Sequence, residues 1–164
     1  MGDCKVYKVG IIGPESTGKS TLATYLAHRY NGVLVPEYAR EYMESRMQGA
    51  EYTYEDVEHI ARQQIEELQR LTTGIDNTLT KIAFFDTELI ITKVWFEHKF
   101  GRCPDFLLQA LRDYPMDVYL LCYPDMEWEP DPVRENPDIR DYLFDWYQKE
   151  IEELGITYYI IKHE

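Results

Sequence analysis

A short segment near the start of the chain has the residue types and spacing that bind a triphosphate. Gly13 and Gly18 bound a loop that ends in Lys19 and Ser20, in the pattern G-x-x-x-x-G-K-[ST]. In such a loop backbone N–H groups converge on phosphate oxygens, the lysine reaches the β- and γ-phosphates, and the hydroxyl joins the shell of a Mg²⁺ ion. We therefore expect a site for ATP and Mg²⁺ formed by Gly13, Pro14, Glu15, Ser16, Thr17, Gly18, Lys19, Ser20 and Thr21.

A carboxylate is expected beside this loop. The apolar run that begins at Lys81 ends in Asp86, and a carboxylate in that position either holds Mg²⁺ or activates a nucleophile. The alternative is that Asp86 caps the next helix, because Asp is a favoured N-cap. We expect Ser20 and Asp86 to be the metal-site residues, and Lys19 and Asp86 to be catalytic.

A second group of candidates follows a short apolar run at residues 33–35. Glu37 can bind sugar hydroxyls or take the proton from an attacking hydroxyl, and Arg40 can steady negative charge. Tyr38 can stack an aromatic ring. The alternative for Glu37 and Arg40 is a surface ion pair at i,i+3. We expect substrate contacts from Glu37, Tyr38, Arg40 and Asp86, with Glu37 also catalytic.

A lid is expected at about residues 124–141. Residues 123–136 carry three prolines among acidic residues, and the arginines of the expected lid are Arg134 and Arg140. A lid that brings arginines over the triphosphate excludes water and stabilises the charge in transfer. We expect Arg134 to be catalytic and both arginines to contact the nucleotide; the alternative is an acidic surface loop.

The hydrophobic pattern alternates between strands and helices along the chain. Expected strands are 5–12, 33–35, 81–87, 118–122 and 157–161; expected helices are 19–30, 53–71, 88–99, 104–113 and 136–154. This order predicts one α/β domain over residues 1–164, with a parallel β-sheet sandwiched by helices. Ligands bind beyond the carboxyl ends of such strands, so the loop, Glu37, Asp86 and the residues after Cys122 should share one rim.

Composition narrows the class of ligand. The net charge of −13 argues against a surface that binds nucleic acid or membrane and favours a small-molecule substrate. Cys4, Cys103 and Cys122 lack paired spacing, so we expect neither disulfides nor a metal cluster. With no apolar stretch long enough for a membrane span and no signal peptide, we expect a cytoplasmic protein; its oligomeric state stays open.

Four segments together resemble the ribosylnicotinamide kinase domain of NadR-type proteins. They are Gly-Pro-Glu-Ser-Thr-Gly-Lys-Ser at 13–20, Glu-Tyr-Ala-Arg-Glu-Tyr at 37–42, Phe-Phe-Asp-Thr at 84–87, and Tyr-Pro-Asp-x-x-Trp-x-x-Asp at 123–131 with Arg134 after it. The resemblance runs from about residue 5 to 161. It implies a phosphate-loop fold like that of nucleotide kinases, and transfer of the ATP γ-phosphate to the ribose 5′-hydroxyl of nicotinamide riboside in NAD biosynthesis. It also implies that 13–20 hold the triphosphate, Asp86 is the metal- or base-side carboxylate, Glu37 contacts substrate and Arg134 lies in the lid.

The resemblance has two departures. Full-length members carry an N-terminal adenylyltransferase domain and often a DNA-binding domain, so we expect this chain neither to complete NAD synthesis nor to act as a DNA-bound repressor. Pro36 stands where kinase members tend to place an aromatic residue. A kinase for another nucleoside or nucleotide and a nucleotide-dependent regulatory ATPase remain alternatives. Whether the nucleotide is ATP or GTP is also open. So is the question of which carboxylate acts as the general base.

Overall fold

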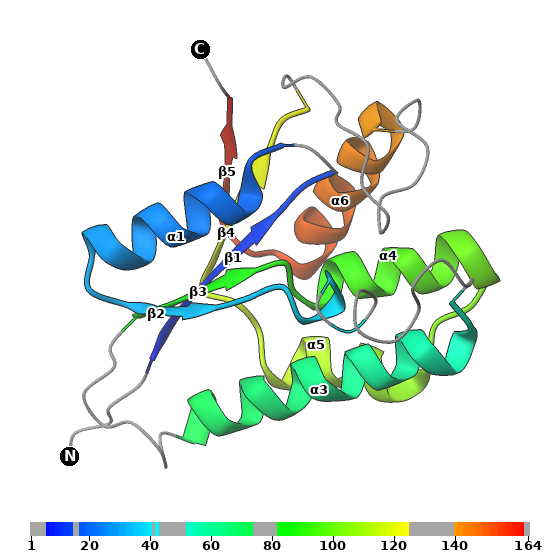
Figure 1. Cartoon of the computed structure of the whole chain (residues 1–164). Coiled ribbons are helices and arrows are strands. Elements are labelled where there is room, and N and C mark those ends of the chain that lie inside the picture. Colours follow the sequence, from blue (N-terminus) through cyan, green and yellow to red (C-terminus); the bar gives the residue numbers. More distant parts are fainter. Residues whose placement is uncertain are drawn as a thin grey trace.

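A five-stranded sheet with helices on both faces makes up the structure (Figure 1). The structure is a computed structural model, and it describes residues 6–14, 17–40, 42, 52–73, 82–124 and 140–162. The elements in chain order are β1 (Tyr7–Ile12), α1 (Lys19–Arg29), β2 (Val33–Val35), α3 (Tyr54–Thr73), β3 (Ile82–Asp86), α4 (Leu89–Phe100), α5 (Asp105–Asp113), β4 (Val118–Cys122), α6 (Arg140–Leu154) and β5 (Tyr158–Ile161). The predicted α/β class with a parallel sheet is confirmed.

The strands lie in the order β2-β3-β1-β4-β5, and every neighbouring pair is parallel. Residue Ile11 of β1 lies opposite Asp86 of β3, and Ile12 lies opposite Leu121 of β4. Because all strands run the same way, their carboxyl ends meet at one rim. The segments that follow β1, β2, β3 and β4 therefore start close together, as the sequence predicted.

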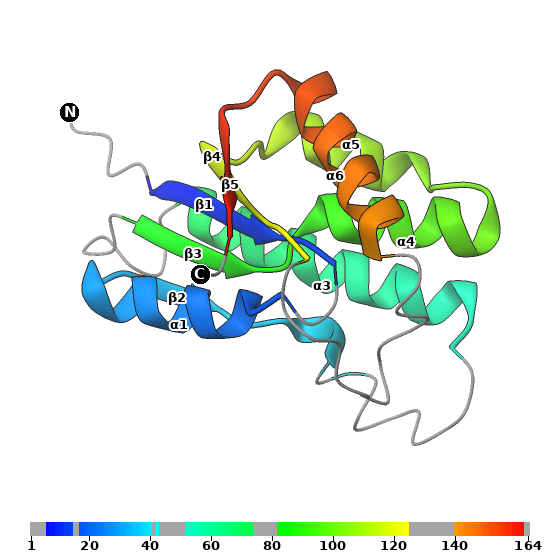
Figure 2. The ribbon, with the colours of Figure 1, turned by 90° about the horizontal axis from the view of Figure 1, so that it is seen from above.

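The two faces of the sheet have separate cores. On one face α1 packs through Ala23 and Ala27 against Val9, Ile11 and Phe84. On the other face α3, α4, α5 and α6 cover a larger core, to which β3 contributes Phe85. The views in Figures 1 and 2 show α1 on one side of the sheet, and α3 and α4 on the other. Side chains alternate along a strand, so Phe84 and Phe85 point to opposite faces.

Several helix ends follow the capping patterns of the sequence. Thr53 and Asp56 form a reciprocal capping box before α3, in which the Asp56 carboxylate accepts from the Thr53 N–H (2.8 Å) and the Thr53 hydroxyl accepts from the Asp56 N–H (3.2 Å). Gly101 ends α4 with φ 75°, and Gly155 follows α6 with φ 71°, the left-handed region that glycine adopts at low cost. The helix expected from residue 136 is described from Arg140 onward.

None of the helices in the described ranges combines the length and apolarity needed to cross a bilayer.

Candidate active site

The loop after β1 takes a shape that favours glycine at its first position. Gly13 has φ +156°, and a Cβ there would lie 2.8 Å from the Cys122 carbonyl oxygen and 3.2 Å from Thr17 Oγ1. Gly18 closes the loop with φ 80° and is the N-cap of α1. The backbone thus passes tightly against the end of β4 and turns directly into the helix. Within the loop, Glu15 and Ser16 lie outside the described residues.

The first turn of α1 is open to an anion. Its N-cap, Gly18, has no side chain to accept from the first amides, and the first turn carries no acidic residue. By contrast, the first turns of α3, α5 and α6 each carry at least one Asp or Glu. Because the amino end of a helix holds unpaired N–H groups and a partial positive charge, α1 can bind phosphate oxygens there.

Lys19 lies against the loop that precedes it. Its Nζ donates to the Pro14 carbonyl oxygen at 3.1 Å, and the Thr17 hydroxyl donates to the same oxygen at 2.8 Å. Thr17 is buried. The Pro14 carbonyl therefore closes the loop on itself and holds the ammonium beside the first turn of α1, where a bound phosphate could accept from it instead.

The two predicted metal-site residues are in contact. The Ser20 hydroxyl donates to Asp86 Oδ2 at 2.6 Å, although 66 positions separate these residues in the chain. Asp86 is 5% exposed, and its Oδ1 is buried with no hydrogen-bond partner in the described part of the chain. The alternative role for Asp86 as a helix cap is not observed, because the N-cap of α4 is Glu88.

These oxygens fit a Mg²⁺ ion bound together with a nucleotide. Ser and Asp oxygens are the hard ligands that Mg²⁺ prefers, and the unpaired Asp86 Oδ1 leaves a lone pair for the ion or its water. Within the described ranges, no group of three or more His, Cys, Asp or Glu residues is placed to hold a metal. Phosphate oxygens and waters would therefore have to complete the coordination, as is usual for Mg²⁺ on a nucleotide.

The residues that follow Asp86 line a cavity on the other face of β3. It has a volume of about 150 Å³ and is bounded by the end of β2, by α3 and by the start of α4. Its lining residues are Val35, Pro36, Tyr38, Gln63, Gln64, Glu67, Leu68, Phe85, Thr87, Glu88 and Leu89. Alternation within β3 explains part of the placement: Asp86 has the parity of Phe84 and points toward α1, whereas Phe85 has the opposite parity and lines the cavity. Thr87, just beyond the strand, also lines it.

Glu88 is a buried carboxyl in the wall of this cavity. It is 3% exposed, and its Oε1 caps α4 by accepting from the Ile90 N–H at 2.8 Å. Burial raises the pKa of Glu88 to about 7, although hydrogen bonds from the Ile90 N–H and the Tyr119 hydroxyl act in the opposite direction. The pKa of Tyr119 is raised well above its usual value, first by its own burial and then by the charge of Glu88.

Tyr38 forms another part of the cavity wall and is held against α3. Its hydroxyl lies 3.0 Å from Nε2 of His59, and the His59 ring lies 4.8 Å from that of Tyr42. The Tyr42 hydroxyl in turn donates to the Asp56 carboxylate at 2.7 Å. The segment after β2 is thereby fixed to the first turns of α3, with an aromatic ring presented to the cavity.

The other predicted substrate residues do not line this cavity. Glu37 and Arg40 form the i,i+3 ion pair that the sequence allowed, with 3.6 Å between the carboxylate oxygen and Nε. Both side chains are partly exposed, and such pairs contribute little to stability. Arg140 is the first residue of α6, whereas Arg134 and most of the expected lid lie outside the described residues. The roles expected of these four residues stay predictions.

Sequence reasoning missed much of the cavity. Gln63, Gln64, Glu67, Thr87 and Glu88 were not among the predicted site residues, yet all five line it. One signal was present: Gln64 falls at helical spacing within an otherwise apolar stripe of α3, beside positions occupied by Ile60, Ala61 and Leu68. A polar residue in that stripe marks a place where the helix faces something other than the core. The Oε1 of Gln64 accepts a hydrogen bond from the Thr92 hydroxyl at 2.6 Å.

The sheet order and the loop define the fold of phosphate-loop nucleoside triphosphatases, of the nucleotide-kinase-like type. A solved thymidylate kinase from Ehrlichia chaffeensis matches 98% of this chain and 88% of its own with a TM-score of 0.64, at 16% sequence identity. At that identity the likeness concerns the fold.

The chain belongs to a family described as an AAA domain, whose model matches residues 8–164. Within this class it resembles NadR. It is 31% identical over 131 residues to the Trifunctional NAD biosynthesis/regulator protein NadR of Salmonella typhimurium, covering 79% of this chain and 31% of that protein. Two crystal structures of NadR, one in complex with NR and one with NAD and AMP-PNP, match at 26% identity with TM-scores of 0.75 and 0.77. They cover 94% and 97% of this chain and 43% and 44% of theirs.

The resemblance to NadR-type kinase domains that the sequence motifs indicated is thus confirmed. The chain spans about a third of the length of this curated relative.

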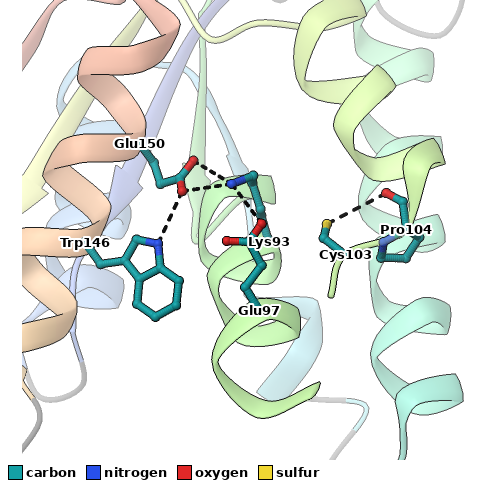
Figure 3. Close-up of polar contacts among 6 residues, drawn as sticks. All are labelled: Lys93, Glu97, Cys103, Pro104, Trp146 and Glu150. Atoms are coloured by element: carbon teal, nitrogen blue, oxygen red, sulfur yellow. Dashed lines mark hydrogen bonds and ion pairs between the residues drawn. The ribbon is translucent and has the colours of Figure 1, made fainter. Parts of the chain in front are cut away.

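A second polar cluster, away from the rim, joins α4 to α6 (Figure 3). Lys93 Nζ lies 2.9 and 2.8 Å from the two carboxylate oxygens of Glu150 and 3.2 Å from Glu97, and Trp146 Nε1 also donates to Glu150. Burial would lower the pKa of Lys93, but the hydrogen bonds and charges of Glu150 and Glu97 raise it above its ordinary value. Nearby, burial raises the pKa of the Cys103 thiol to about 12 and the charge of Glu97 adds to this, so the thiol stays protonated at neutral pH. The cluster fixes α6 on the helix that begins beside Asp86.

We expect Lys93→Met to lower the free energy of unfolding by about 2 kcal/mol, because it leaves the largely buried Glu150 carboxylate without its cation. Lys93→Met/Glu150→Met should return to within about 1 kcal/mol of the wild type, since two apolar side chains can replace a buried pair. Urea unfolding at pH 7 measures both. The loss of unfolding free energy in Lys93→Met, relative to the wild type, should persist up to the ordinary lysine pKa of 10.5. It should shrink only as the pH rises through the raised pKa of Lys93 in the folded wild type.

Arg70→Met is the matched control, because Arg70 pairs with Glu67 on the exposed surface of α3. Its loss should change stability by less than about 0.5 kcal/mol. A Lys93→Met protein as stable as the Arg70→Met protein would contradict the role given to the buried pair.

Proposed function

We propose that this chain is an ATP-dependent kinase that phosphorylates the ribose 5′-hydroxyl of nicotinamide riboside. The observation that carries the proposal is the meeting of Ser20 with Asp86 at the end of β3, with the cavity directly beyond it. One face of the strand end offers a triphosphate site, and the other offers room for an acceptor. Solved complexes of NadR hold NR, NAD and AMP-PNP. The likeness to NadR therefore supports ATP and nicotinamide riboside as the two ligands of this chain.

On the nucleotide side, the α1 amides and Lys19 would bind the β- and γ-phosphates. Ser20 and Asp86 would hold Mg²⁺, which neutralises charge on these phosphates when bound. Lys19 would leave the Pro14 carbonyl for the γ-phosphate and follow the charge as the phosphoryl group moves. We retain Arg134 and Arg140 as predicted lid contacts to the nucleotide.

On the acceptor side, Tyr38 would pack against the ring of the nucleoside, and polar groups of α3 and α4 would fix its sugar. The described lining includes the acidic residues Glu67 and Glu88 and no Lys or Arg. Because Glu88 is buried in this wall, the wall favours a neutral or cationic acceptor over one that already carries a phosphate. The positive pyridinium ring of nicotinamide riboside suits it. The acceptor hydroxyl would then lie between Asp86 and Glu37, either of which can take its proton.

A kinase for another nucleoside is the second candidate. Pro36 lines the cavity where an aromatic residue would stack a pyridinium ring, and the Gln63 and Gln64 amides can pair with the edge of a purine or pyrimidine base.

The deciding experiment is transfer of labelled γ-phosphate from ATP–Mg²⁺ to nicotinamide riboside, with ATP alone as the control. We expect a labelled mononucleotide, formed much faster than free phosphate. A panel of nucleosides and nucleoside monophosphates separates the candidates: a different preferred nucleoside supports the second one. Slow hydrolysis unaffected by every acceptor would contradict both and favour a regulatory ATPase.

Lys19→Ala should lower kcat/KM for transfer at least about a thousandfold, because its ammonium contacts charge that moves in the transition state. Lys149→Ala is the control, since Lys149 lies exposed on α6, and its rate should match the wild type. Unchanged turnover in the Lys19→Ala protein would refute the assignment of the loop.

Asp86→Asn should lower kcat about a hundredfold or more and raise the Mg²⁺ concentration needed for half-maximal rate, because an amide is a weaker ligand than a carboxylate. Titration of the rate with Mg²⁺ at fixed ATP measures both effects, with Asp145→Asn on the exposed surface of α6 as the control. If the Mg²⁺ dependence of Asp86→Asn were that of the wild type, Asp86 would not be a metal-site residue.

A further inference from the structure

Thr87 has an unusual backbone conformation. Its φ is 74°, and the other non-glycine residue with positive φ in the described ranges is Asn31, in the turn after α1. Asparagine tolerates the left-handed region, whereas a β-branched residue is strained there. The Thr87 N–H donates to the Ile11 carbonyl oxygen at 2.9 Å, which holds this conformation at the end of β3.

The hydroxyl of Thr87 is also unpaired. The residue is 7% exposed, and its Oγ1 is one of three buried side-chain polar atoms without a partner in the described part of the chain. Another is Oδ1 of the adjacent Asp86. A buried hydroxyl without a hydrogen bond destabilises the folded protein, and a valine of the same shape would avoid that cost. Two unpaired polar atoms on neighbouring residues therefore indicate groups that a ligand completes.

The position of Thr87 indicates which ligand. The residue lines the cavity together with Tyr38, Gln64 and Glu88, on the face of β3 opposite to the loop. Any acceptor in this cavity places nearest to Asp86 the part that carries its attacking hydroxyl. For a nucleoside that part is the sugar. A threonine hydroxyl both donates and accepts, so it can satisfy a sugar hydroxyl that does the same.

We propose that Thr87 Oγ1 is a binding group for a sugar hydroxyl of the acceptor; this rests on the proposed function in placing the acceptor in the cavity. The hydroxyl costs stability in the free protein and is paired only in the complex. Thr87 thus favours acceptors that present a hydroxylated sugar at the end of β3 over a free heterocycle.

Thr87→Val tests this, because it removes the hydroxyl and keeps the shape and the β-branch. The melting temperature of the ligand-free protein should rise by about 2–4 °C as the unpaired group is removed. KM for the nucleoside should rise about ten- to a hundredfold while KM for ATP stays unchanged. Thr87→Ser, which keeps the hydroxyl, should retain the acceptor KM to within about threefold.

Thr92→Val is the matched control for the melting temperature. Thr92 is also a buried threonine near the start of α4, but its hydroxyl donates to Gln64 Oε1. Its removal should lower the melting temperature. Thr87→Val would overturn the proposal if it also lowered the melting temperature of the free protein, if it raised KM for ATP instead, or if the acceptor KM stayed unchanged.

A binding measurement separates this proposal from the kinase itself. Nicotinamide riboside and adenosine should raise the melting temperature of the wild type more than that of Thr87→Val, whereas nicotinamide without its sugar should not distinguish the two. Sugar-dependent stabilisation without phosphoryl transfer would contradict the kinase and retain the role of Thr87. Equal stabilisation of both proteins by the nucleosides, or none, would refute that role whether or not transfer occurs.

Discussion

The parallel pairing of β1 with β3 is the constraint on which the site depends. Ile11 lies opposite Asp86, so the loop that leaves β1 and the carboxylate that ends β3 emerge at the same height of the sheet. Alternation then points Asp86 toward α1, where it accepts from Ser20, and points Phe85 toward the cavity beside α3, which Thr87 also lines. A slip of one residue in this register would turn each of these side chains to the wrong face. One strand pairing therefore places the Ser20–Asp86 contact on one face of the end of β3 and the cavity on the other.

Buried polar groups are concentrated where β3 ends. Asp86, Thr87 and Glu88 are consecutive and all buried, and two of them carry unpaired oxygens. Such groups lower stability, and this structure tolerates them because the surrounding elements are held firmly: a large apolar core under α3, α4 and α6, and the Lys93–Glu150 pair between α4 and α6. The helix that begins at the strained segment is thus fixed along its length by contacts that have no part in the chemistry.

Charge is distributed to favour a polyanion at one place on an acidic protein. The chain carries a net charge of −13, yet the first turn of α1 has no Asp or Glu, and Lys19 lies beside it. The start of α4 also lacks acids in its first turn, but there the buried Glu88 carboxyl caps the amides. Of these two amino ends, that of α1 is the one left for phosphate oxygens.

The sequence by itself determined what depends on local spacing: the loop from Gly13 to Ser20, the alternation of strands and helices, the capping box at Thr53, and the rim shared by the loop and Asp86. Those features follow from patterns a few residues long, which is why they could be predicted. The tertiary structure alone decided the composition of the cavity, because Tyr38, Gln64 and Thr87 come from three separate segments that only the folded sheet and helices bring together. It also decided that Glu37 and Arg40 lie outside that lining and that the Thr87 hydroxyl is buried and unpaired, since burial and hydrogen bonding at one residue depend on neighbours distant in the chain.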